Sequence, residues 1–446
     1  MIEAGFGRAD VTPRVGVELC GFGPFINRKS IAVRDRLWAR AMAVRKGPTT
    51  LIVVSCDLVG VTHIMTQTVR RIVCERTGVP EANVLVHCTH THSAPNTFGN
   101  LIGWGAEDPP YRELLPGRIA QACIAAVNDL APAEFRHGTA PCEHIALNRE
   151  YDRDAPPLAE VLREDWRPAK PELTDTTCHV LTVYRGGQLA GFVSHFSCHP
   201  VVCCEETRYI HGDFCGVATN ALEREYPGST GLFLQGAQGD VNSCCVHKPE
   251  QESLLALDVI AARYAGSVRQ AMAAAKPFEV DVMRSVMRPW MFSRKNISLE
   301  QLDAWLAEQE AILAKPGASD TDYVVRMAMV HATTLRSFTA KMRAGQSLDR
   351  PIEVYGLRLG PLSLLASPFE IFQAIKRDIV KGAKSAIPLV VGISNDGVGY
   401  APDHEAAKRG GYAADTVPMM TGQLPFANIH DELVRAMLEI DAALVV

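Results

Sequence analysis

Two apolar runs separated by one helix-length segment constrain the fold more than any other feature. Residues 50–56 form a β-branched run, residues 62–77 carry apolar side chains at helical spacing and end at Gly78, and residues 84–88 form a second apolar run. Strand, helix and strand at this spacing predict a βαβ unit with a parallel strand pair. Functional groups in such units gather beyond the carboxyl ends of the strands.

The second run continues directly into Thr89-His90-Thr91-His92-Ser93-Ala94-Pro95. In extended backbone, side chains alternate between faces, so His90 and His92 are expected to project to the same side. Imidazole is a common neutral metal ligand, which makes a histidine pair at a strand end a candidate metal site. The alternative is a structural pair, with one histidine at a turn and the other at the surface.

The rest of the chain alternates between the same kinds of segment. Strands are predicted at 34–46, 178–184, 189–196, 231–234, 352–359, 362–366 and 389–393, and helices at 111–127, 213–225, 252–274, 371–381 and 428–443. Residues 5–13 are expected to form an ordered loop. Two helical segments, 298–313 and 323–343, interrupt this order and are interpreted as an insertion that covers the site. We therefore predict an α/β fold in one large domain over residues 1–446, with a mixed β-sheet core, flanking helices and a helical insertion at 298–343.

Composition excludes several classes of function. The 446 residues are 47% hydrophobic and 21% charged with a net charge of −5, and there is no basic cluster, which disfavours nucleic-acid binding. No apolar run has the length of a membrane span, so no membrane insertion is expected. The 13 cysteines are an odd number and several lie inside apolar strands, as in reduced cytoplasmic proteins. The expected partner is a small-molecule substrate, and a homo-oligomer is compatible with the sequence.

Further polar residues follow apolar runs and lie beside Pro or Gly in the same way as His90 and His92. They are His199, Glu370 and Tyr400. Two histidines and a carboxylate are a typical catalytic zinc set with room for water, although iron and manganese use similar sets. Each residue also has a structural explanation: Glu370 as a first-turn glutamate and Tyr400 as a buried aromatic residue.

An ordered series of motifs extends from near Gly5 to Tyr412. It comprises Asp10-Val11-Thr12-Pro13, Arg36-Leu37, Asp57-Leu58, Thr89 to Pro95, Asn148-Arg149, Gly212-Asp213, Gly239-Asp240-Val241, and Gly399-Tyr400 with Tyr412. This series resembles the catalytic domain of the neutral (non-lysosomal) ceramidase family. The resemblance implies one Zn²⁺ ion held by His90, His199, Glu370 and Tyr400. It also implies that His92, Arg149 and Tyr412 surround the reacting oxygen and the scissile carbonyl.

His195 is the competitor of His199, because it lies one strand alternation earlier, but no proline follows it. The chain also departs from the family pattern after Gly239-Asp240-Val241. The family places a catalytic serine there, whereas this chain has Asn242, which cannot be a nucleophile, and Ser243 comes one residue late. Asn242 is expected to orient substrate or to donate to an oxyanion.

A second departure lies at the ends of the chain. Family members are secreted and carry a C-terminal β-sandwich domain, whereas this sequence begins at the first motif and stops at Val446. The expectation is therefore a divergent cytoplasmic member that lacks the catalytic serine and the second domain and acts on a soluble substrate.

The preferred hypothesis is a zinc-dependent hydrolase that cleaves a carboxamide bond of a soluble small molecule by metal-activated water. His92 would accept a proton, and Arg149 and Tyr412 would stabilise the oxyanion or fix a substrate carboxylate. Asp240 would orient a neighbouring group or act as a buried capping residue. The alternatives are a metal-dependent esterase, lactonase or glycoside hydrolase, a true ceramidase, and a non-catalytic metal-stabilised binding protein.

Overall fold

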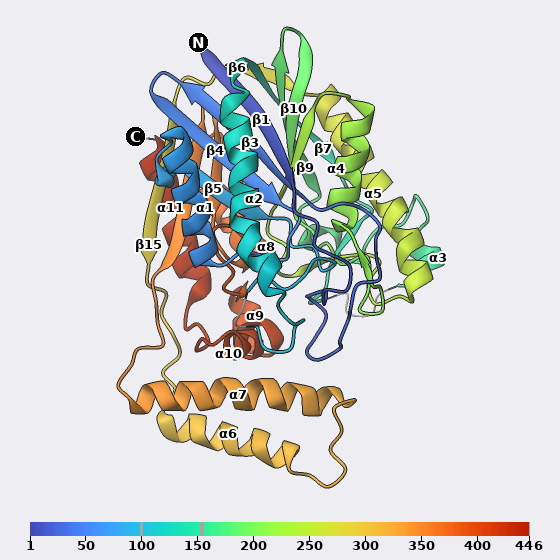
Figure 1. Cartoon of the computed structure of the whole chain (residues 1–446), viewed down its shortest axis with the longest axis vertical. Helices are drawn as coiled ribbons and strands as arrows, with labels where there is room; N and C mark the ends of the chain where they lie inside the picture. The colour runs from blue at the N-terminus through green and yellow to red at the C-terminus, as the bar shows by residue number, and fades with distance from the viewer. Residues whose placement is uncertain (99–100, 152–155, 446) are drawn as a thin grey trace.

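The computed structural model describes residues 1–98, 101–151 and 156–445. Three larger sheets form the body of the molecule (Figure 1). The first sheet has the order β5 (Val84–Cys88), β4 (Thr49–Cys56), β3 (Trp38–Lys46), β1 (Ile2–Asp10) and β6 (Ala131–Pro132). The second has the order β12 (Thr230–Gln235), β10 (Gln188–Phe196), β9 (Thr177–Arg185), β7 (Glu134–Pro141) and β14 (Lys276–Phe278). The third has the order β15 (Met283–Trp290), β16 (Ile352–Leu359), β17 (Leu362–Ala366) and β19 (Ile387–Val391).

Smaller strand pairs connect the loops at one end of the body. They are β2 (Ala32–Val33) with β11 (Tyr209–Ile210), β8 (Ala146–Asn148) with β13 (Val241–Ser243), and β18 (Glu370–Ile371) with β20 (Tyr400–Ala401). Short helical segments lie in the same loops: α3 (Leu158–Val161), α9 (His404–Arg409), α10 (Val417–Met420), and a π-helical turn at Tyr412–Thr416.

Each large sheet turns one face to a shared apolar core and the other face to helices. Met42, Val193 and Leu364 represent the three sheets in the shared core. The outer faces are covered by α1 (His63–Thr77) and α2 (Pro109–Asn128), by α4 (Asp213–Glu225) and α5 (Glu250–Ala273), and by α8 (Gln373–Gly382) and α11 (Ile429–Val445). Strand alternation produces this division, because neighbouring residues of one strand face opposite layers.

The predicted βαβ unit is confirmed. Strands β4 and β5 are parallel, with Cys56 opposite Cys88. The Thr62 side chain caps α1 by accepting the N–H of Met65 at 3.2 Å, and Gly78 ends the helix in the left-handed conformation. The α/β class with mixed sheets, flanking helices and a helical insertion is likewise confirmed.

Three of the longer strands, β1, β7 and β15, were missed or misassigned by the sequence interpretation. The segment expected to be a loop from residue 5 is the end of strand β1, which lies between β3 and β6. Its Gly5 and Gly7 allow α2 to approach closely, since a Cβ on either residue would lie 2.1–2.3 Å from a carbonyl oxygen of that helix. Strand β15 is an edge strand that pairs only with β16 in the third sheet.

The helical insertion consists of α6 (Leu299–Leu313) and α7 (Tyr323–Arg343), which lie side by side below the body (Figure 1). Ser298 caps α6 by accepting the N–H of Gln301. Met327 and Val330 of α7 belong to the same buried cluster as Val417 and Met420 of α10. The insertion therefore packs against the outside of the loop region described next. Within the described residues, none of the helices has both the length and the hydropathy of a membrane span.

Candidate metal centre

All three sheets contribute a predicted ligand to one end of the molecule. His90 follows β5 of the first sheet, His199 follows β10 of the second, and Glu370 and Tyr400 follow β17 and β19 of the third. Glu370 and Tyr400 are direct partners in the parallel pair of β18 and β20. These four residues are buried, with at most 9% of their surface exposed. The carboxyl ends of the strands thus assemble the set, as the predicted topology required.

The sequence interpretation expected His90 and His92 to share one face of an extended strand, and this was wrong. Strand β5 ends at Cys88, and His90 has a φ of 71°, in the left-handed region that non-glycine residues seldom occupy. The two side chains converge because of this turn, and their Nε2 atoms lie 3.3 Å apart. Strained backbone at a residue of this kind is a recurring feature of functional sites.

Ligand-type atoms of three candidate ligands lie close together. The Oε2 atom of Glu370 lies 2.9 Å from Nε2 of His199 and 3.5 Å from Nε2 of His90. The rings of His90 and His199 are inclined by 64°, so their lone pairs can point at a common centre. Zinc bonds of about 2.0–2.2 Å in a tetrahedron imply ligand atoms roughly 3.3–3.5 Å apart.

The other ring nitrogens of these two histidines are fixed by backbone carbonyls. His90 donates its Nδ1–H to the Val59 carbonyl at 2.6 Å, and His199 donates its Nδ1–H to the Gln238 carbonyl at 2.6 Å. A carbonyl can only accept, so the proton lies on Nδ1 and the Nε2 lone pair is free. Burial lowers the pKa of His199 to about 4, which keeps the ring neutral at pH 7. This is the arrangement typical of metal-binding histidines.

His92 is held in a different way. Its carbonyl accepts a hydrogen bond from Arg28, and its ring lies edge-on to Phe22 with centroids 5.0 Å apart. The buried Nδ1 atom has no hydrogen-bond partner among the described residues. Burial, followed by the neighbouring His90 and His199, lowers the pKa of His92 well below its usual value, so it is neutral at pH 7. Ligand atoms of His90, His92 and His199 lie within 4.8 Å of one another, so this ring directly adjoins the predicted ligand set.

Arg149 and Asn242 lie together on the His199 side of this group. The backbone of Asn242 in β13 pairs with that of His199 in an isolated parallel β-bridge. The Oδ1 of Asn242 accepts the Nη1–H of Arg149 at 3.4 Å. The guanidinium donates from Nη2 to the Gly239 carbonyl at 2.7 Å and lies 5.2 Å from the ring centre of Tyr400. Burial alone would lower the pKa of Arg149, but Tyr400 and Glu370 raise it, so the group is a permanent cation.

Ser243 lies outside this group. It is fully buried, and its Oγ accepts the backbone N–H of Cys245 at 3.3 Å. Strand alternation turns it away from Arg149, so it does not replace the missing serine.

Asp240 and Tyr412 take different positions. The Asp240 carboxylate accepts the backbone N–H of Gln373 at the start of α8 and the side-chain N–H of Asn148, both at 2.9 Å. Burial raises the pKa of Asp240 to about 7. It fits the capping alternative, since it supports the loops and not the ligands. Tyr412 is 48% exposed, and its ring centre lies 5.8 Å from that of Tyr400, at the edge of the site.

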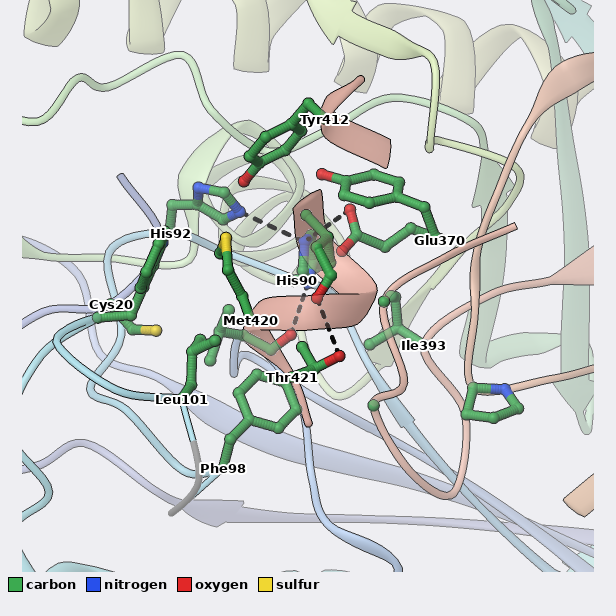
Figure 2. Close-up of a pocket in the computed structure, with 18 residues that line it drawn as sticks. Cys20, His90, His92, Phe98, Leu101, Glu370, Ile393, Tyr412, Met420 and Thr421 are labelled. Atoms are coloured by element: carbon green, nitrogen blue, oxygen red, sulfur yellow. Dashed lines mark hydrogen bonds and ion pairs between the residues drawn. The ribbon is translucent and has the colours of Figure 1, made fainter. Parts of the chain in front are cut away.

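A cavity of about 90 Å³ opens beside the converging ligands. Figure 2 shows His90 and Glu370 pointing into it, with Tyr412 on one side and Phe98 and Leu101 on the other. Its apolar lining comprises Val59, Phe98, Leu101, Trp104, Ile393, Val417 and Met420. The candidate ligands therefore adjoin a mainly hydrophobic space.

Two further groups of side chains bring ligand-type atoms within 4.8 Å of one another. They are Cys203 with His211 and Asp213, and His404 with His430 and Asp431. In the first, the Asp213 carboxylate accepts three backbone N–H groups and Nδ1 of His211 accepts a fourth. In the second, the two rings are stacked at 4.1 Å with only 8° between their planes, and parallel rings cannot direct both lone pairs at one ion. Hydrogen bonding and stacking account for these two groups.

Several positioning residues escaped the sequence interpretation. Gln235 donates through Nε2 to the carbonyls of Thr89 and Cys198, which precede His90 and His199 in the chain. His195, the competitor of His199, instead donates its Nε2–H to the Val390 carbonyl at 2.8 Å. Gly21 adjoins the ring of His92 so closely that a Cβ would lie 2.4 Å from its Cγ. Only Gln235 carried a sequence signal, since it directly follows the strand predicted at 231–234.

Comparison with known proteins places these observations in context. Residues 2–254 match the family model described as neutral/alkaline non-lysosomal ceramidase, N-terminal. A neutral ceramidase of Pseudomonas aeruginosa is 25% identical over 245 residues, which make up 52% of this chain and 35% of that protein. The match thus spans about a third of the length of the curated relative.

Solved structures show the same fold. The crystal structure of neutral ceramidase from Pseudomonas aeruginosa superimposes with a TM-score of 0.76 at 18% identity, covering 99% of this chain and 74% of that one. A structure described as ceramidase complexed with C2 gives a TM-score of 0.74 at 18% identity, covering 100% of this chain and 75% of that one. At this level of identity the likeness concerns the fold alone.

Proposed function

Because this chain belongs to the neutral/alkaline non-lysosomal ceramidase family, we propose that it is a zinc-dependent hydrolase of a carboxamide bond. The observation that carries the proposal is the convergence of the Nε2 atoms of His90 and His199 on the Glu370 carboxylate. Both histidines are oriented by carbonyls that leave these lone pairs free. Tyr400, the strand partner of Glu370, is the proposed fourth ligand.

The donor set fits zinc in chemistry, and the separation of His90 and Glu370 fits it in spacing. Two neutral imidazoles and one carboxylate are a common catalytic combination that leaves a position open for water or substrate. When bound there, zinc would supply Lewis-acid polarisation of the carbonyl and activation of water at neutral pH. Asn242 cannot act as a nucleophile, which favours direct attack by water over an acyl-enzyme route.

His92 is the proposed proton carrier. It lies next to the ligands, is neutral at pH 7, and has no carbonyl partner that fixes its proton on Nδ1. In the hydrolysis the water oxygen bonds to the carbonyl carbon, the C–N bond breaks, and His92 passes the proton of the water to the departing nitrogen. Arg149 is a permanent positive charge beside Tyr400 and balances negative charge that develops at the carbonyl oxygen.

The cavity supports an apolar acyl group next to the scissile bond. Phe98, Leu101 and Met420 line the side that adjoins His90 and Glu370. This lining favours an N-acyl compound over a sugar or another wholly polar substrate. It equally suits the hydrocarbon of a lipid amide, so ceramide hydrolysis is the second candidate function.

A reducing compartment is part of the proposal. All 13 cysteines, each of which the structure describes, are free, and most are buried. Free buried thiols are typical of cytoplasmic proteins, which supports a cytoplasmic location.

Metal analysis and a substrate panel test the proposed function. The purified protein is expected to contain one zinc ion per chain and to lose activity on chelation, and His90→Ala should lose both metal and activity. The panel comprises N-acyl amides with chains from acetyl to palmitoyl, a short-chain ceramide, aryl esters, lactones and aryl glycosides. Activity that survives both chelation and His90→Ala would contradict the mechanism. Turnover of esters, lactones or glycosides without amides would contradict the assigned bond.

A further inference from the structure

The side-chain amide of Asn242 has a defined orientation. Its Oδ1 accepts from the Arg149 guanidinium, which has donors only and can accept nothing. The reverse orientation would place two donors against each other. The Nδ2 group, with two N–H donors, therefore points away from Arg149, and no described residue accepts from it.

The Arg149 guanidinium already makes contacts within the protein. One terminal nitrogen donates to the Gly239 carbonyl and the other to Asn242. The planar guanidinium lies over the ring of Tyr400. This arrangement makes Arg149 a positioning residue for Asn242 and a source of positive potential. Asn242, which is partly exposed, has two N–H donors left for a ligand.

Asn242 and the apolar cavity lie on different sides of the candidate ligands. The cavity is lined by His90, Glu370 and Tyr400 but by neither Asn242 nor Arg149. Asn242 instead pairs with His199 through the backbone, in an isolated parallel β-bridge. A substrate carbonyl held between these histidines would direct one substituent into the apolar cavity and the other toward Asn242.

We infer that Asn242 selects substrates whose departing amine carries a carboxylate close to the scissile nitrogen, as in N-acyl amino acids. The inference rests on the proposed amide hydrolysis and names the substrate class of that site. Donation of the Nδ2–H groups to an anion, beside the positive charge of Arg149, is a charge-assisted hydrogen bond. A hydroxyl group at the same place receives only a neutral hydrogen bond, and an ammonium group is repelled by the guanidinium.

The test compares two amides that share the acyl group, N-butanoylglycine and N-butanoylethanolamine. The zinc-loaded wild-type protein is expected to show a kcat/KM roughly tenfold higher for the glycine conjugate. Asn242→Asp places an acceptor and a negative charge at this position, and should lower kcat/KM for the glycine conjugate about 100-fold. The same variant should lower kcat/KM for the ethanolamide at most about tenfold, because only a neutral hydrogen bond is lost there. Asn242→Ser, whose hydroxyl both donates and accepts, should bring the ratio close to one.

Metal content, circular dichroism and thermal midpoint of each variant serve as controls for folding. An equal loss on both amides, or a wild-type preference for the ethanolamide, overturns the inference. Calorimetric titration of both amides separates the inference from the proposed function. Tighter binding of the glycine conjugate that disappears in Asn242→Asp supports the inference even without turnover. Hydrolysis of both amides without discrimination overturns the inference and leaves the proposed function intact.

Discussion

The Nε2 atoms of His90 and His92 lie 3.3 Å apart, yet only His90 donates its other ring nitrogen to a backbone carbonyl. The fixed ring has a permanently available lone pair on Nε2, as a metal ligand needs. The other ring is free to carry its proton on either nitrogen, as a proton carrier needs. The two neighbouring histidines of one motif thus have different hydrogen-bonding environments, which fit the proposed roles of His90 as a ligand and His92 as a proton carrier.

Zinc affinity and kcat should distinguish the proposed metal ligands from the proposed proton carrier His92. Glu370→Gln removes the negative charge between His90 and His199, and is expected to weaken zinc binding by at least about tenfold, as loss of a ligand does. His92→Ala should retain one zinc ion per chain while kcat falls about 100-fold, because proton transfer is lost. Zinc competition titration and elemental analysis measure both effects. Loss of zinc in His92→Ala with retention in Glu370→Gln would reverse the assignment.

Gly21 should be essential for the position of His92. In Gly21→Ala the new Cβ would lie 2.4 Å from Cγ of His92, so the ring must move, and activity is expected to fall more than about tenfold with zinc retained. Gly23 is the matched control, because its φ of 116° is close to the 121° of Gly21 but a Cβ there meets nothing within 4 Å. Similar activity losses in Gly21→Ala and Gly23→Ala would attribute the effect to backbone strain alone.

Arg40 should matter for stability and not for metal binding. It is buried and pairs with Asp57 at 3.0 Å and Glu223 at 3.1 Å, so Arg40→Met would leave the buried Asp57 carboxylate without its cation and Glu223 with only the half-exposed Arg8. The expected decrease in the free energy of unfolding is about 3–5 kcal/mol. Arg8 also pairs with Glu223 but is half exposed, so Arg8→Met should cost at most about 1 kcal/mol. Urea unfolding of the zinc-loaded variants measures both values, and equal costs would contradict the assigned burial effect.

Acid should destabilise the metal-free protein through buried histidines. Burial lowers the pKa of His87 and His211 to about 3, and of His179 and His199 to about 4. The unfolded chain protonates near pH 6.5 and the folded chain does not, so unfolding takes up protons between about pH 6.5 and 4. Stability is therefore complete above this window and falls as the pH is lowered through it.

Urea unfolding of chelated protein at a series of pH values measures this slope. His211→Asn keeps an acceptor for the Asp213 N–H and should reduce the proton uptake by about one. His63→Asn at the start of α1 is the control, since this histidine is partly exposed. An unfolding midpoint that does not change between pH 7 and pH 4 would be inconsistent with the buried, neutral state of these rings.

Parts of the fold could be predicted because local signals agreed with tertiary structure. Residues 62–78 combine a threonine cap, an apolar stripe and a glycine stop, and the helix begins and ends there. Strand β1 could not be predicted, because Gly5 and Gly7 give no periodicity and serve the close approach of α2, a contact with a distant segment. The edge strand β15 has exposed or half-buried residues throughout, and so lacks the alternation that marks a strand.

The candidate site was predictable where each residue ended an apolar run. His90, His199, Glu370 and Tyr400 came from this rule and from the resemblance, and the structure brings them together. Their roles as ligands stay a prediction. Backbone carbonyls of Val59 and Gln238 carry no side-chain signal, so the orientation of the histidines required coordinates. The same holds for the contact of Asn242 with Arg149.

The assembly of the site from all three sheets has a consequence for biosynthesis. His90 and His199 leave the ribosome well before the segment that contains Glu370 and Tyr400 has been translated. A nascent chain that ends between these segments offers imidazoles without the carboxylate, so tight capture of the proposed metal would have to wait until the segment with Glu370 and Tyr400 has been translated. The ion would then join loops far apart in sequence, as a late-formed cross-link does. If the proposed metal binds, the order of the residues along the chain would set when the site can form.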